Sequence, residues 1–301
     1  DWGAGDLAEL ASLCTRVGET GGAAVSTLPL LAAFLDRPFE PAPYRPVSRL
    51  FWNEFFLPVE DLPEFVSCPG LAATWDGPET SSILARLRGR DHVDYRGVMN
   101  LKRGFLQQMA QHFFALGEGT RKESFHAYVH AHPDVEDYAA FRAHVEVRGA
   151  DWREWPDDLV GEQAQHGGYK ERAGGETWAA ARRYHLYCQW QADERLASIA
   201  SRAGSAPLFL DLPVGVHPGG YDTWRRPDLF VPGLSTGAPP DGFFALGQDW
   251  QSPPLHPQRA RVQRHEYFAS CLRHAMEHAG YLRIDHVMSL HRLYVIPSGV
   301  A

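Results

Sequence analysis

The last third of the chain constrains the fold most, because two strand-like stretches enclose a long loop and a helix there. Residues 207–212 and 281–288 are short and mostly apolar, whereas residues 257–279 place apolar side chains at helical spacing before Gly280. A strand, a helix and a second strand in that order predict a parallel sheet whose loops gather at one end. The connection, residues 213–256, is rich in proline and glycine, and loops of this length are usually functional.

The rest of the chain changes character along its length. Residues 1–75 combine a helix that Asp6 can cap with an apolar run at 22–28, which suits a buried parallel strand. Residues 76–204 predict mostly helices, over the spans 99–116, 121–130, 135–147 and 176–203. We therefore expect an α/β fold in three parts, in which 76–204 is a mostly helical insertion and 205–301 resumes the α/β pattern.

Composition excludes several classes of protein. The chain has 29 Lys and Arg residues against 37 Asp and Glu residues, and a formal net charge of −8 argues against a nucleic-acid partner. It contains no apolar run long enough to span a membrane.

The four cysteines form no Cys-x-x-Cys pair, so we predict neither a disulfide framework nor a cysteine-built zinc site, and we expect a reducing cytoplasmic location. Cys14 and Cys271 fall on apolar helix faces and are expected to be buried. Aromatic residues make up 12% of the chain, which suits stacking on sugar rings, although core packing is the plainer explanation.

The strand around Asp285 carries the most informative chemistry. Strand alternation places Arg283 and Asp285 on one face and Leu282, Ile284 and His286 on the other. Opposite charges within an apolar strand are costly unless they pair or take part in chemistry. The neighbouring arginine favours the ionised form of Asp285, and a glycosidic nucleophile must be an ionised, positioned carboxylate. The alternative is a buried ion pair that only stabilises the fold.

Asp211 repeats this pattern near the end of the preceding predicted strand. An acid at the carboxyl end of a parallel strand, just before a long loop, occupies a position favoured for active sites. The alternative is a carboxylate that caps the loop.

The fifteen histidines raise the question of a metal site. His126 and His130 could share a helix face, with His132 nearby, but the glutamate that follows the first histidine of the zinc-protease motif is absent. We therefore predict surface or capping histidines and no metal. His286 and His291 follow the candidate nucleophile and could donate to a substrate hydroxyl. The chain has neither a Gly-x-Gly-x-x-Gly loop nor a phosphate-loop lysine, so nothing supports a nucleotide cofactor.

Several motifs, in a fixed order along nearly the whole chain, resemble the 4-α-glucanotransferases, also called amylomaltases or disproportionating enzymes. The last four of them together are specific, whereas any one alone would be weak. The motifs are Trp2–Leu7, Pro43–Arg49, Tyr138–Phe141, Trp152–Pro156, Asp211–Val214, Ala238–Asp241, Gly247–Trp250 and Arg283–His286.

The resemblance implies a (β/α)₈ barrel with inserted subdomains, of which residues 1–75 and 205–301 would supply a part. It implies cofactor-free transfer of α-1,4-glucan segments between maltooligosaccharides, with glucose or short maltooligosaccharides as acceptors. In this family pattern Asp285 is the nucleophile and Arg283 is its charge partner. The residues that carry over as substrate-binding are Tyr44, Asp211, Asp241, Gln248, Trp250 and His286. The resemblance also implies that Asp241 belongs to a loop over the cleft that keeps water away.

The sequence departs from the family pattern at three places. Ala42 stands where a serine is common, and Gln251 stands where a glycine is common, which puts the local loop geometry in doubt. A retaining mechanism also needs a second carboxyl group, yet residues 286–301, which include a predicted strand at 290–297, contain no Asp or Glu. We therefore expect the chain to be a segment of a longer enzyme. The alternatives are a catalytically incomplete glucan-binding fragment that lacks the general acid/base Glu, and a hydrolase of the same superfamily.

Overall fold

Three short parallel strands form the sheet that carries the candidate site residues. In this computed structural model, which describes residues 2–160 and 175–297, the sheet has the order β1-β4-β7. Its strands are β1 (Val25–Ser26), β4 (Leu208–Leu212) and β7 (Tyr281–Ile284). The register places Asp211 directly beside Arg283. The prediction of a parallel sheet formed by these three segments is therefore confirmed, although each strand is shorter than its apolar run.

A second sheet is built from the segment that the sequence presents as one long loop. Within 213–256 the chain forms a short helix and two strands, and β8 completes an antiparallel sheet of order β6-β5-β8. The strand predicted at 290–297 therefore exists in part, but it does not join the parallel sheet. Its partner β5 contains glycine, serine and threonine, so a search for apolar runs does not detect this strand. The strands outside the parallel sheet are β2 (Phe34–Leu35), β3 (Phe39–Glu40), β5 (Leu234–Ala238), β6 (Gln248–Asp249) and β8 (Tyr294–Pro297).

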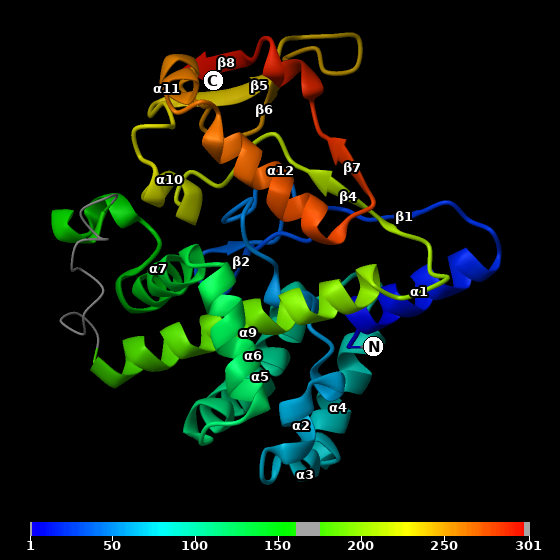
Figure 1. The fold of residues 1–301 in the computed structure, drawn as a ribbon. Helices are drawn as coiled ribbons and strands as arrows, with labels where there is room; N and C mark the ends of the chain where they lie inside the picture. The colour runs from blue at the N-terminus through cyan, green and yellow to red at the C-terminus, as the bar shows by residue number, and fades with distance from the viewer. Residues whose placement is uncertain (1, 161–174, 298–301) are drawn as a thin grey trace.

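Helices make up most of the first two thirds of the chain. Figure 1 shows α2 to α6 and α9 at one end of the molecule, the sheet of β5, β6 and β8 at the other, and β1, β4 and β7 between them. The α-helices are α1 (Leu7–Glu19), α2 (Pro63–Ser67), α3 (Leu71–Trp75), α4 (Pro78–Arg88), α5 (Tyr95–Ala115), α6 (Thr120–Ala131), α7 (Asp134–Arg148), α9 (Gly175–Ala200), α10 (Tyr221–Arg225), α11 (Pro257–Val262) and α12 (Glu266–His278). The 3₁₀ helices are η1 (Glu54–Phe56), η2 (Val59–Asp61), η3 (Trp152–Glu154), η4 (Asp157–Leu159) and η6 (Val287–Leu290).

The helices predicted by apolar spacing are confirmed at α1, α5, α6, α7 and α9. Asp6 caps α1 in a capping box, in which Glu9 accepts from the Asp6 amide in return. The single helix predicted for 257–279 is wrong, because Arg264 and His265 both adopt positive φ and divide it into α11 and α12. The spacing of apolar residues does not reveal this break, because apolar residues recur at helical spacing in both α11 and α12.

One continuous core joins the helices to the parallel sheet. It includes Trp2 beside α1, Leu106 of α5, Tyr187 of α9 and Leu210 of β4, all buried. A smaller cluster lies beyond the end of β4, where Leu212 packs with residues of α11 and α12. All four cysteines are free and buried, which confirms the predicted burial of Cys14 and Cys271. Across the described residues no helix combines the length and the apolar character that crossing a membrane requires.

Candidate active site

Two carboxylates from neighbouring strands meet on one arginine at the carboxyl end of the parallel sheet. Arg283 Nη1 donates to Asp211 Oδ2 at 2.5 Å, and Arg283 Nη2 donates to Asp285 Oδ1 at 2.6 Å. The register explains the first contact, because Asp211 and Arg283 are adjacent across β4 and β7. The Arg283 side chain is 50% exposed and that of Asp285 is 24% exposed, so this is not the buried ion pair that was the alternative. The arginine thus fixes the buried carboxylate of Asp211 and the partly exposed carboxylate of Asp285 at the same end of the sheet.

Tyr44 joins this group from the long loop that precedes η1. Its hydroxyl donates to Asp211 Oδ2 at 2.8 Å, so Tyr44 and Arg283 share one carboxylate oxygen. Partial burial, together with this hydrogen bond, raises the pKa of Tyr44, and the phenol remains a donor at neutral pH. The other oxygen of Asp211, Oδ1, is buried and has no hydrogen-bond partner. Asp211 therefore binds side chains rather than capping its loop, and one of its two carboxylate oxygens has no partner among the described residues.

A cleft of about 500 Å³ opens beside these groups. Tyr44, Asp285 and Trp250 line it, together with Ala42, Arg45, Val214, Asp249, Gln251 and Ser252. The ring of His286 lies edge-on to the Trp250 indole, with 4.8 Å between the ring centroids. The cleft therefore combines aromatic and acidic side chains.

The remaining predicted residues lie on the antiparallel sheet beside the cleft. Gln248 is in β6, and its Oε1 accepts from the Trp250 indole nitrogen at 3.3 Å. Asp241 lies in the loop between β5 and β6, where its side chain accepts from the amides of Phe243 and Phe244. Asp241 is exposed and is not among the residues that line the cleft, so the structure does not bring it together with the other predicted residues.

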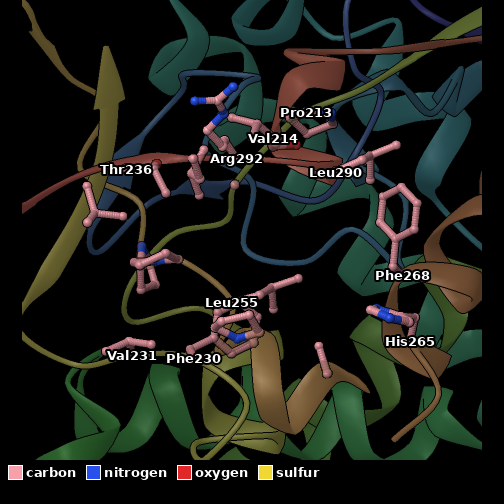
Figure 2. A pocket seen from close by; sticks show the side chains of 18 of the residues that line it. Pro213, Val214, Phe230, Val231, Thr236, Leu255, His265, Phe268, Leu290 and Arg292 are labelled. Carbon is pink, nitrogen blue, oxygen red and sulfur yellow. The ribbon is translucent and has the colours of Figure 1, made fainter. Parts of the chain in front are cut away.

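A second cavity, of about 530 Å³, lies on another side of Asp285. Figure 2 shows its wall, where Phe230, Leu255, Phe268 and Leu290 surround the space with apolar side chains. His291 lines this cavity rather than the cleft. His291 is not among the residues that line the cleft with Tyr44, so the geometry does not support the prediction that His291 donates to a substrate hydroxyl there.

The backbone that carries the site rests on a buried polar network, which sequence reasoning missed. Arg49 is 3% exposed and donates to the carbonyl oxygens of Pro213 and Val214, directly after β4. Its own amide donates to the buried Asp222 of α10, which also accepts from Ser48 and Tyr267. The signal was present, because Ser48 and Arg49 end one of the recognised motifs, but apolar patterning assigns no role to polar residues.

Gln251 shows why a glycine is common at its position. Its φ is +52°, in the left-handed region that glycine adopts at little cost. The Gln251 side chain accepts from Arg45, which also pairs with Glu40, and these contacts hold the rim of the cleft. At Gln251 the loop therefore has a backbone conformation that favours glycine, held here by a non-glycine residue. Ala42 lines the same cleft.

This arrangement defines a class of protein: an α/β fold with carboxylates at the carboxyl ends of adjacent parallel strands, beside a cleft that aromatic side chains line. Comparison with known proteins identifies the family within this class. The family model for 4-alpha-glucanotransferase matches residues 1–301, and the chain belongs to this family.

Individual relatives agree with the family match. The chain is 36% identical to a 4-alpha-glucanotransferase of Mycobacterium tuberculosis over 309 residues, covering 99% of the chain and 42% of that protein. It is 30% identical to the 4-alpha-glucanotransferase of Haemophilus influenzae over 320 residues, covering 99% of the chain and 45% of that protein. The chain therefore spans less than half the length of these relatives.

Two solved structures share the fold. The amylomaltase of Corynebacterium glutamicum superposes with a TM-score of 0.81 at 29% identity, covering 99% of this chain and 40% of that one. An amylomaltase of Streptococcus agalactiae, solved with acarbose, superposes with a TM-score of 0.78 at 20% identity, covering 99% of this chain and 59% of that one. The fold class is therefore α/β of the amylomaltase barrel type, of which β1, β4 and β7 are the adjacent parallel strands described here.

Proposed function

We propose that the protein is a retaining 4-α-glucanotransferase in which Asp285 is the nucleophile. One observation carries the proposal: Arg283 fixes Asp211 and Asp285 together beside a cleft lined by Tyr44 and Trp250. A carboxylate held by an arginine at the end of a barrel strand is ready to attack an anomeric carbon. The family match supports the choice of an α-1,4-glucan as donor.

The proposed reaction has two displacements. In the first, an Asp285 carboxylate oxygen forms a bond to the anomeric carbon while the bond from that carbon to the leaving glucan oxygen breaks. A second carboxyl group, which we do not assign among these residues, gives its proton to the leaving oxygen. In the second, the 4-hydroxyl of an acceptor sugar attacks the same carbon, loses its proton to that group and releases Asp285. Two inversions give net retention.

The neighbouring side chains would position the sugar. Asp211 Oδ1, which is buried and unpaired, suits a sugar hydroxyl that donates to it. Tyr44 and Trp250 offer ring faces, and Gln248 and His286 would orient the indole and contact the sugar.

The loop of Asp241 would lie over the bound glucan. Its Phe243 and Leu246 side chains are 95% and 98% exposed, a state that contact with a bound sugar would relieve. Excluding water there favours transfer over hydrolysis, because the covalent intermediate must wait for an acceptor.

The finer assignments belong to the same proposal. The acceptors would be glucose or short maltooligosaccharides, and four buried free cysteines support a reducing, cytoplasmic location. Residues 76–204 would be an insertion in the barrel, because β1 pairs directly with β4 although the helices α4 to α9 separate them in sequence. The shared core supports close packing of that insertion against the barrel segments.

The decisive experiment replaces the nucleophile in the whole protein. We expect Asp285→Asn to lower glucose release from maltotriose by at least about a thousandfold while maltooligosaccharide binding, measured by calorimetry, persists. Asp228→Asn, an exposed carboxylate paired with Arg259, is the matched control and should keep full activity. Retained turnover in Asp285→Asn would refute the nucleophile assignment. Binding without turnover in the unaltered protein would instead favour a glucan-binding role, and free sugar released without transfer products would favour a hydrolase.

A further inference from the structure

A cluster of metal-ligand side chains lies away from the cleft, where α6, α9 and α12 meet. It consists of His132, which ends α6, Asp193 of α9 and Glu277 of α12. One ligand atom from each of the three lies within 4.8 Å of the other two, and His132 Nε2 is 3.8 Å from Glu277 Oε1. The packing of α9 against α6 and against α12 brings together residues that are far apart in sequence (Figure 1).

Buried polar groups surround this cluster. His278 is 5% exposed, and its Nε2 lies 2.8 Å from Asp193 Oδ1, a contact that fixes the carboxylate. His274 stacks on Trp52 with 4.1 Å between the rings, and its Nε2 is buried without a hydrogen-bond partner. A histidine that orients a ligating carboxylate is the outer contact that metal sites use.

The charge at the cluster also calls for a cation. Asp193 and Glu277 bring two carboxylates into the cluster, and these give it a negative potential. A divalent ion between them would balance that potential.

We propose that His132, Asp193 and Glu277 bind one Zn²⁺ ion. The donor set of one imidazole and two carboxylates suits zinc, whereas Mg²⁺ and Ca²⁺ prefer oxygen ligands alone. Bonds of about 2.1 Å require donor atoms about 3.4 Å apart, and the 3.8 Å between His132 and Glu277 is close to that value. Both side chains are partly exposed, so they can close the remaining gap and solvent can supply the fourth ligand.

The ion would tie the barrel to its proposed insertion. It would fasten α6 and α9 to α12, and α12 leads directly into β7, which carries Arg283. The sequence-based prediction of no metal rests on the four scattered cysteines and on the local group of His126, His130 and His132. The structure instead draws His132 together with residues that lie 61 and 145 positions further along the chain.

The test measures zinc binding, so it needs no transfer activity. After chelator treatment, the unaltered protein should bind one equivalent of Zn²⁺ in competition with a chromophoric chelator, and its Tm should rise by several degrees with Zn²⁺ but not with Mg²⁺. His132→Gln and Glu277→Gln should each weaken binding at least about tenfold and abolish the Tm rise. Their Tm in chelator should match that of the unaltered protein, which verifies folding.

His130→Gln is the matched control, because His130 is exposed on the same helix two residues before His132. It should leave zinc binding and the Tm rise unchanged. If His130→Gln weakened binding as much as His132→Gln, zinc would be binding surface histidines in general and the proposal would fail. It would fail equally if the unaltered protein bound no zinc at micromolar concentrations.

Discussion

At the scale of single residues, Gln251 stands out because it holds a left-handed backbone at the rim of the cleft. A side chain in this region crowds the following carbonyl, whereas glycine does not. The Gln251 side chain offsets this cost by accepting from Arg45. The position therefore combines a local backbone penalty with a contact that ties two loops of the site together.

Comparing Gln251→Gly with Gln251→Ala isolates the backbone cost. Both variants lose the contact with Arg45, so only the conformational penalty differs between them. We expect the glycine variant to be more stable by about 1 kcal/mol in denaturant unfolding. The same pair of substitutions at Ser270, inside α12, should give the opposite order by a similar amount. Equal stability of the two variants at Gln251 would contradict the argument.

Arg49 is the residue on which the end of β4 depends. It donates to the carbonyl oxygens of Pro213 and Val214, and its positive charge favours the ionised form of Asp222. Burial raises the pKa of Asp222, while its donors, Ser48, Tyr267 and the Arg49 amide, oppose that rise. Removing the guanidinium leaves the two carbonyl oxygens without this donor and takes away a positive charge that stabilises the buried Asp222 carboxylate.

We therefore predict that Arg49→Met lowers the free energy of unfolding by about 3–5 kcal/mol. Arg259→Met is the matched control, since Arg259 pairs with Asp228 at the surface, and it should cost less than about 1 kcal/mol. Chemical denaturation of both variants measures the difference. Similar losses in the two would mean that the buried network contributes no more than a surface ion pair.

At the scale of secondary-structure elements, one ionic group fastens three helices. Glu146 of α7 accepts from Arg103 of α5 at 2.6 Å and lies 2.7 Å from His185 Nε2 of α9. Burial alone would raise the pKa of Glu146, but the hydrogen bonds and charges of His185 and Arg103 outweigh it and hold that pKa at about 2. The folded state therefore favours the ionised carboxylate.

This shift predicts a pH dependence of stability. Because the folded pKa lies below the unfolded value of 4.5, the stabilisation is fully present above pH 4.5 and is lost as the pH falls towards 2. Glu146→Gln should cost up to about 3 kcal/mol of unfolding free energy at pH 7, and clearly less at pH 3. Glu136→Gln, at an exposed ion pair on the same helix, should change little at either pH. A Glu146→Gln cost that does not shrink on acidification would contradict the prediction.

Helices are predicted from the spacing of apolar residues better than the short strands are. The helices α1, α5, α7 and α9 have apolar faces that pack on the common core, so their periodicity predicts them well. The strands β5 and β6 are short and carry small or polar residues, so the pairing of β5 with β6 and with β8 comes from main-chain hydrogen bonds rather than from a hydrophobic pattern.

At the scale of the whole molecule, the fold places distant motifs at one edge of a sheet. Asp211 and Arg283 are separated by 72 residues, yet parallel pairing of β4 with β7 makes them neighbours. Tyr44 reaches the same carboxylate from 167 residues away. Between β1 and β4 the chain leaves the sheet, forms a series of helices and then returns, so that β4 pairs directly with β1.

The sequence by itself determined the class of fold, the main helices, the three parallel strands and the motifs that place the chain in its family. These follow from hydrophobic spacing and residue identity, which are local properties. Only the tertiary structure decided that Arg283 bridges two carboxylates, that Arg49 supports the loop after β4, and that His132 meets Asp193 and Glu277. Such contacts depend on the register of strands and the packing of helices, where side chains from remote segments become neighbours without leaving a periodic signal in the chain.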